Sequence, residues 1–127
     1  MHRISNGNLT YLGLLVALVA TCAHAEPLPD PLQAGWKGVP VCDNIHETAQ
    51  IRVLRCTFPP GEGHERHFHP KHFGYALSGG TMRITDSKGV RDAELTGGSY
   101  FASDGTAWHE VVNIGETTVA YLMIEPK

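Results

Sequence analysis

Past its first forty residues the chain is a series of short apolar or β-branched runs, each followed by a turn rich in glycine, proline or aspartate. The clearest runs are 51–58, 81–85 and 117–124. Their Val, Ile, Thr and Tyr residues favour strands. Glycine-containing turns are expected at 79–80, 87–89, 96–98 and 114–116. Beyond residue 25, no segment keeps apolar residues at helical spacing for more than a turn or two. Many short strands at this spacing predict an all-β sandwich or barrel.

The N-terminus has the order of a secretory signal peptide. Arg3 precedes an apolar run over 11–20, and Ala23-His24-Ala25 follows it. This order predicts a signal peptide over residues 1–25, cleaved after Ala25. The apolar run is too short for a comfortable membrane span, which needs about 20 residues. We therefore expect an exported protein, secreted or periplasmic, that has no membrane contact after processing.

The mature part, residues 26–127, is long enough for one domain and too short for two. Residues 26–40 contain a dense group of prolines, which predicts an extended leader along the surface. Residues 41–127 then form the domain. The whole chain carries a formal charge of −3, and Arg3 is the one charged residue of the segment 1–25, so its loss leaves −4. A negative domain is poorly suited to polyanions, which excludes nucleic acid as a partner.

Two cysteines, Cys42 and Cys56, remain after processing. Export takes them to a compartment in which disulfides persist, so they are candidates to pair. A bridge closing a loop of about 15 residues would contribute about 3 kcal/mol on the chain-entropy model. The other interpretation is two unpaired cysteines that serve as small buried apolar residues. The sequence leaves both open.

Histidines are the residues that point most directly to chemistry. His67 and His69 alternate in the manner of a strand, so both face one side, roughly 7 Å apart along the backbone. Pro70 cannot donate to a central ladder, and a bend there can return His72 to the same side. His109, from a distant strand, would complete a nitrogen shell about 2.0–2.1 Å from an ion. The competing interpretation is a solvated histidine-rich loop with His109 packed in the core.

The four histidines His67, His69, His72 and His109 therefore predict a site for one divalent transition metal. Imidazole suits Zn, Cu, Fe and Ni better than Mg or Ca, and Mn completes the candidate set. Glu65 shares strand parity with His67, so its carboxylate is a candidate acceptor for an imidazole N–H, although a solvent-facing surface carboxylate is the more common outcome. Aromatic and Met side chains at 82, 100, 101, 108 and 123 are candidates either for a pocket lining or for plain core.

The segment 59–79 resembles the first motif of the cupin family. That motif is a glycine, five residues, His-x-His, three or four residues, a glutamate, six residues and a glycine. Gly61, His67, His69 and Gly79 fit these positions. His72 stands at the place of the glutamate, and the spacer before it is one residue short.

The segment 98–113 resembles the second cupin motif, in which a glycine, a proline, a second glycine, a histidine and an asparagine follow at fixed spacing. Gly98, His109 and Asn113 match in register, whereas Asp104 and Thr106 replace the proline and the second glycine. The resemblance covers about 53–125. It implies a small double-stranded β-helix, or jelly-roll, barrel of the cupin type, and it suggests a homodimer that pairs through strand edges.

Two functions are compatible with such a protein. One is a metal-dependent oxidoreductase of dioxygenase type that acts on a small organic substrate. The other is a non-catalytic module whose metal binds or senses a small ligand, or only stabilises the barrel, because a closed four-ligand shell is typical of structural sites. His72 in place of the glutamate weakens the case for a two-His-one-carboxylate iron site. No nucleotide-binding or hydrolase motif is present, and the sequence assigns no catalytic residue.

Overall fold

The computed structural model describes residues 20, 22 and 25–127. In this part of the chain every regular element is a strand, and it contains no helix capable of crossing a membrane. The predicted signal peptide lies almost wholly outside the described residues. The strands are β1 (Gly35–Trp36), β2 (Val39–Pro40), β3 (Cys42–Glu47), β4 (Ile51–Phe58), β5 (Gly63–His69), β6 (His72–Ser78), β7 (Gly80–Asp86), β8 (Gly89–Leu95), β9 (Tyr100–Ser103), β10 (Thr106–Asn113) and β11 (Val119–Pro126).

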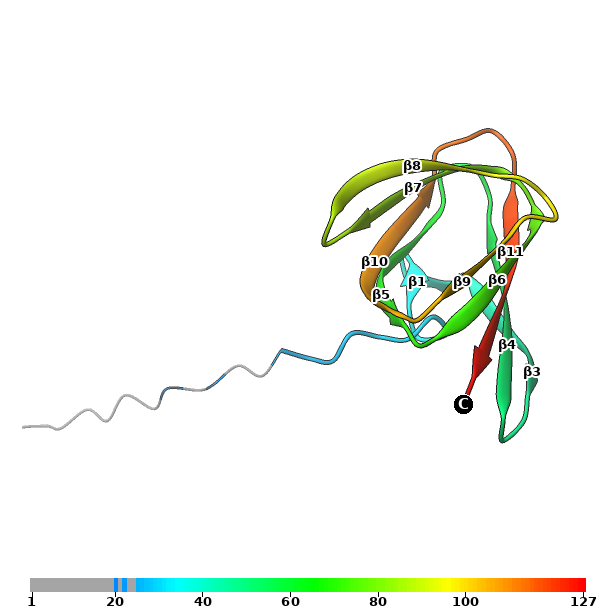
Figure 1. Cartoon of the computed structure of the whole chain (residues 1–127). Coiled ribbons are helices and arrows are strands. Elements are labelled where there is room, and N and C mark those ends of the chain that lie inside the picture. Colours follow the sequence, from blue (N-terminus) through cyan, green and yellow to red (C-terminus); the bar gives the residue numbers. More distant parts are fainter. Residues whose placement is uncertain (1–19, 21, 23–24) are drawn as a thin grey trace, which may run out of the picture.

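Two antiparallel sheets face each other and enclose the barrel (Figure 1). One has the order β5-β10-β7-β8, and the other has the order β3-β4-β11-β6-β9. Strands distant in sequence are therefore neighbours, with β4 beside β11 and β5 beside β10. The predicted all-β barrel is confirmed. This topology brings the His-x-His strand directly next to the strand of the second motif.

The core lies between the sheets and follows the alternation of the strands. On β4, Leu54, Cys56 and Phe58 are buried while Arg55 and Thr57 are exposed. Val119 and Met123 of β11 face the same interior. Each large apolar side chain buried in this way contributes roughly 1.5–3 kcal/mol relative to exposure.

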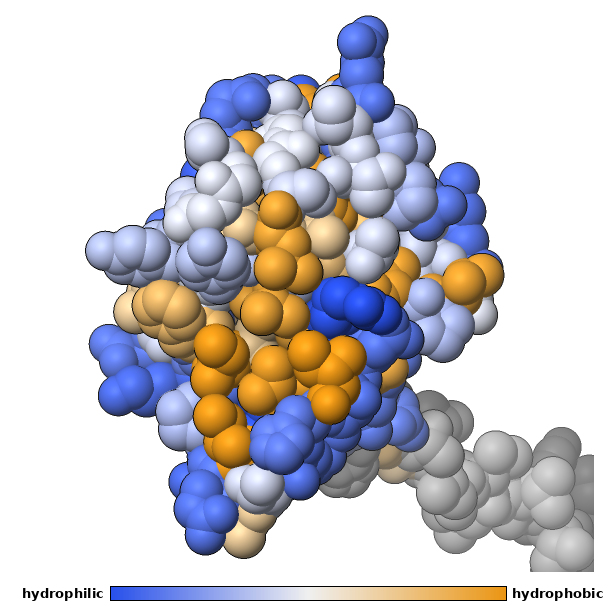
Figure 2. Space-filling view, turned by 90° about the vertical axis from the view of Figure 1, so that its right-hand side faces the viewer, coloured by the Kyte–Doolittle hydropathy of each residue, from blue (hydrophilic) through white to orange (hydrophobic). Residues whose placement is uncertain are grey.

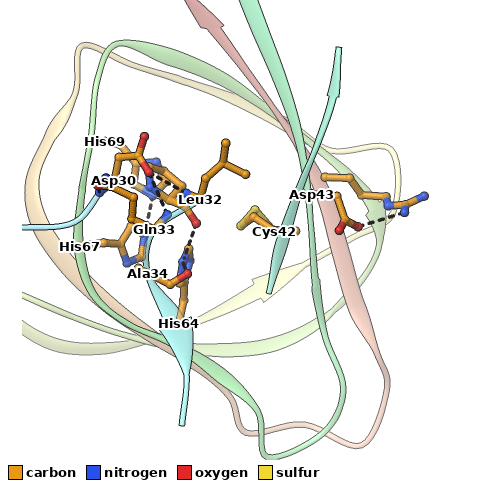
Figure 3. Close-up of a disulfide and its surroundings, with 12 residues drawn as sticks. Asp30, Leu32, Gln33, Ala34, Cys42, Asp43, His64, His67 and His69 are labelled. Carbon is orange, nitrogen blue, oxygen red and sulfur yellow. Dashed lines mark hydrogen bonds and ion pairs between the residues drawn. A yellow bond between two sulfur atoms is a disulfide. The ribbon is translucent and has the colours of Figure 1, made fainter. Parts of the chain in front are cut away.

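A disulfide joins Cys42 of β3 to Cys56 of β4, which are opposite each other in the strand register (Figure 3). Both residues are buried in the core cluster. The structure thus decides between the two interpretations of these cysteines in favour of the bridge. The sequence separation is 14 residues, so the contribution to stability is about 3 kcal/mol.

The segment before β3, expected as an extended leader along the surface, is buried at two of its residues. Pro31 and Ala34 are buried, and β1 with β2 forms a small hairpin. The Asp30 carboxylate accepts hydrogen bonds from the amides of Leu32 and Gln33, which fixes a turn. This turn lies beside the histidines of β5 (Figure 3). Two residues of the expected surface segment thus pack inward while the others stay partly or fully exposed, because proline density reports backbone conformation and not burial.

Ion pairs anchor this segment to the barrel. Arg52 of β4 contacts the carboxylates of Asp30, at 2.8 Å, and of Glu125, at 2.6 Å. Glu125 is 2% exposed. Pulling residues 26–40 away from the barrel would leave the Arg52 charge without its Asp30 partner, which is costly for a largely buried group. The ion pairs therefore hold this segment against β4 and β11.

The outer face of the five-stranded sheet is unusually apolar. Phe73, Tyr75 and Leu77 of β6 are exposed there, and Phe73 stacks on Tyr100 of the edge strand β9. Figure 2 shows hydrophobic residues gathered over this side of the molecule. Contiguous exposed apolar patches of this kind mark interaction surfaces more often than chance.

Candidate metal centre

Two neighbouring strands bring three histidines together. His67 and His69 come from β5, and His109 comes from β10, where it is paired with His67 in the register. His67 and His69 are buried, and His109 is partly buried. Extra residues in each strand shift the register on both sides of His109. Such bulges redirect side chains, and here they aim one imidazole of β10 at two of β5.

The Nε2 atoms of the three rings form a nearly equilateral triangle. The distances are 2.8 Å between His67 and His69, 2.9 Å between His69 and His109, and 3.1 Å between His109 and His67. A ring nitrogen either carries a proton or offers a lone pair. Among three nitrogens at least two are of the same kind, so hydrogen bonds alone leave one unfavourable contact. A cation that accepts three lone pairs removes this conflict.

The triangle also has suitable dimensions for a transition ion. A metal about 2.0–2.1 Å from each nitrogen, with right angles between its bonds, separates the nitrogens by about 2.9 Å, whereas a tetrahedral ion separates them by about 3.3–3.4 Å. The observed distances fit the right-angled arrangement. Three neighbouring ligands of this type occupy one face of an octahedron and leave other positions open.

The tautomer of His67 suits a ligand. Its Nδ1 lies 2.6 Å from the backbone oxygen of Glu65, so the Nδ1–H donates to that carbonyl and the Nε2 lone pair faces the triangle. The partner is the carbonyl and not the carboxylate that strand parity suggests. The Glu65 carboxylate instead accepts a hydrogen bond from the amide of Lys37 at 3.0 Å.

His72, the predicted fourth ligand, is buried beside the triangle but is not a member of it. Its ring centroid lies 4.9 Å from that of His69. Its Nδ1 is 2.8 Å from the oxygen of Pro70, and its ring meets that of Phe101 edge to face. The bend at Pro70 therefore does return His72 to the inner side. Its ligation of a metal stays a prediction.

His64 is the residue that the sequence interpretation missed. It is fully buried, its ring stacks on that of His67 with centroids 3.7 Å apart, and its Nε2 lies 3.0 Å from the oxygen of Pro31. His64 has the wrong parity for an unbroken strand, but the bulge before His67 turns both to the interior. The same bulge explains why Glu65 points away. The burial of His64 follows from the bulge, and no residue of the sequence marks the position of that bulge.

Burial keeps these imidazoles neutral. Burial first, and then the nearby His67 and His72, lower the pKa of His69 to about 2. Burial also lowers the pKa of His64 and of His109 to about 3, with neighbouring histidines adding to the effect. The pKa of His67 is lowered as well, again by burial first. Neutral imidazole is the form that binds a metal, so the site is set to coordinate rather than to protonate.

Asn113, which matches the end of the second motif, has a structural role. It is fully buried, and its amide donates to the carbonyls of Phe58 and Thr117 at 2.8 and 2.7 Å. Its side-chain oxygen accepts from the amide of Gly115. Asn113 thus closes the turn between β10 and β11 and fixes the end of the strand that carries His109.

A largely enclosed apolar cavity of about 90 Å³ adjoins His109. Met82, Ile84 and Val111 line it from the four-stranded sheet, and Ala76 and Tyr121 line it from the other. Phe101 also contributes, with its ring so close to Gly74 that a Cβ there would lie 2.3 Å away. Of the pocket residues expected from the sequence, Met82 and Phe101 line this cavity, whereas Met123 is core and Tyr100 is 72% exposed.

Comparisons with known proteins agree with this architecture. The cupin domain family, Cupin_2, matches residues 54–125. The solved structure of a cupin domain from Bordetella pertussis is similar with a TM-score of 0.66 and 21% identity over 73% of this chain and 94% of that one. The structure of the polyketide cyclase RemF from Streptomyces resistomycificus is similar with a TM-score of 0.57 and 19% identity, over 89% of this chain and 80% of that one. The structure of a predicted oxalate decarboxylase from Thermotoga maritima is similar with a TM-score of 0.51 and 20% identity, over 65% of this chain and 76% of that one. A search of curated proteins found no match.

The lowered pKa values predict that the metal-free protein loses stability in mild acid. The unfolded chain binds protons at His64, His69 and His109 near the ordinary pKa of 6.5, while the folded chain does so only near pH 2–3. The free energy of unfolding therefore falls as pH drops below about 6.5, by up to about 1.4 kcal/mol per pH unit for each histidine. Urea unfolding at pH 7, 6 and 5 after chelator treatment measures this slope. His64→Phe should reduce it by about a third, and a flat profile would contradict the argument.

Proposed function

This chain belongs to the cupin family, and on that premise we propose that it holds one divalent transition metal through His67, His69 and His109 and acts on a small organic molecule there. The observation that carries the proposal is the triangle of Nε2 atoms, 2.8–3.1 Å on each side. Zn, Fe, Cu and Ni suit an all-imidazole ligand set best, and Mn completes the candidates.

The arrangement favours an enzyme over a structural metal site. Closed sites have four protein ligands, whereas three protein ligands with an open position are typical of catalytic ones. An ion bound here would supply Lewis-acid character or a binding place for O₂ and a chelating substrate. The reaction type we propose is that of an oxidoreductase of dioxygenase type. Three-histidine ligation keeps that chemistry available without the family's glutamate.

The chain's own residues would perform the remaining tasks. The Glu65 carbonyl and the stacked ring of His64 hold the His67 imidazole in one orientation. The buried turn at 30–34 covers the side of His64 and His67, which keeps water from that flank. The apolar cavity beside His109 offers a dry volume for a substrate. Exclusion of water strengthens every electrostatic interaction within such a site.

Elemental analysis of protein purified without a tag or chelator tests the ligand set. We expect about one metal ion per chain in the wild type and its loss in His109→Ala, because each ligand contributes directly. His72→Ala should retain the ion with an affinity weakened by about 10–100-fold, the effect typical of residues that support ligands. The matched control His46→Ala changes an exposed histidine of β3 and should have no effect. Metal lost equally from His72→Ala and His109→Ala would make His72 a fourth ligand.

The same preparations decide whether the site is catalytic. Iron-loaded wild type should consume oxygen with at least one member of a panel of diketones, thiols and phenols, and His109→Ala should not. Full metal occupancy with no turnover by any loaded metal would support the non-catalytic module instead. Absence of stoichiometric metal would end both proposals.

We also propose that the protein is exported, because the order of residues 1–25 is that of a signal peptide. The Cys42–Cys56 disulfide is compatible with an oxidising compartment. Expression in a Gram-negative host should yield a periplasmic protein whose intact mass corresponds to a chain beginning at Glu26. A cytoplasmic protein of full-length mass would contradict this.

The expected homodimer has a suitable surface in the exposed apolar face of β6 next to the edge strand β9. Leu77 is 47% exposed on that face. We expect Leu77→Lys to convert a dimer to a monomer, because burying an unpaired ammonium opposes association. Light scattering coupled to gel filtration measures the change. Val90→Lys, at a 65% exposed site on β8 of the other sheet, is the matched control and should stay dimeric. A monomeric wild type would refute the dimer.

A further inference from the structure

The cavity beside His109 contains one polar group that the protein does not use. Tyr121 of β11 lies opposite Cys56 and Ala76 in the register, and both of these residues face the interior. Its ring packs on Phe58 with centroids 5.4 Å apart. Among the described residues its hydroxyl makes no hydrogen bond. Tyr121 is only partly buried, and a tyrosine hydroxyl on an apolar cavity wall is a donor that a ligand can use.

The hydroxyl is a donor under all ordinary conditions. Burial raises the pKa of Tyr121 well above its usual value, so the proton stays on the oxygen. A ligand would therefore meet it as a neutral O–H and would have to present an acceptor.

The other walls define what such a ligand can be. Ser99 is the second hydroxyl of the lining, and it already donates to the carbonyl of Thr96 at 2.6 Å. No Lys, Arg, Asp or Glu is among the lining residues, so a charged ligand would lose its hydration without compensation. A cavity of 150 Å³ holds a benzene ring, and a cavity of about 90 Å³ therefore holds about four carbon atoms.

We propose that this cavity binds a small neutral organic molecule of about four carbons, held by the apolar walls and by a hydrogen bond from the Tyr121 hydroxyl to its carbonyl or ether oxygen. The proposal rests on the proposed function, since it names the substrate class of the same site. It assigns to Tyr121 the recognition of the polar end and to Met82, Ile84 and Val111 the recognition of the hydrocarbon.

The test compares two probes of the same shape in two proteins. Butanone presents a carbonyl oxygen, and 2-methylbut-1-ene replaces that oxygen with a methylene group. NMR titration of zinc-loaded wild type and Tyr121→Phe gives the four dissociation constants. We expect Tyr121→Phe to weaken butanone binding by about 3- to 10-fold, the value of one hydrogen bond, and to leave the alkene unchanged or slightly tighter. Resonances of Ile84 and Val111 should shift in both cases.

Thermal unfolding of the same variant separates ligand recognition from a structural role. Because the hydroxyl has no protein partner, Tyr121→Phe should melt at the wild-type temperature or above it. A clearly lower melting temperature, no binding of butanone to the wild type, or equal weakening of both probes would each overturn the proposal. Zinc content measured on the same samples keeps the two proposals apart: metal bound without ketone selectivity refutes only this one, and absent metal refutes the proposed function.

Discussion

The convergence of three imidazole nitrogens on one point is the constraint on which the rest of the structure depends. No choice of tautomers satisfies all three contacts among His67, His69 and His109 by hydrogen bonding. The surrounding chain must therefore force the rings together. Paired bulges in β5 and β10 aim them, and a carbonyl and a stacked ring hold His67. A scaffold that maintains so unfavourable an arrangement of neutral groups is one arranged for a cation.

The forces that hold this arrangement come from both ends of the chain. Arg52 links Asp30, which precedes β1, to Glu125 of the last strand β11, and all three side chains are largely withdrawn from water. The carbonyls of Pro31 and Ala34 in that segment lie within hydrogen-bond distance of the Nε2 of His64. The ion pairs of Arg52 thus hold Asp30, Asp30 fixes the turn, and the turn positions the His64 ring against the candidate ligand His67. The histidine cluster and the strands that close the barrel are therefore linked by direct contacts.

Much of this could be predicted from the sequence, and the two failures have separate physical causes. Strand alternation and motif spacing predicted the all-β barrel and the meeting of His67, His69 and His109, because both depend on local periodicity and register. The role of His64 was missed, since one bulge inverts strand parity and leaves no mark on the residue pattern. The burial of Pro31 was missed because composition does not reveal which side a segment packs against.

The disulfide has a practical implication for defining the domain. The family match begins at residue 54, yet Cys42, which is bonded to Cys56, lies upstream of that boundary, as does the carboxylate that meets Arg52. An expression clone trimmed to the matched segment would carry a lone thiol in its core, a buried Glu125 carboxylate without Arg52, which also lies upstream, and an uncovered His64. The part of the chain joined by these contacts is therefore longer than the homology unit, and it includes the turn at Asp30.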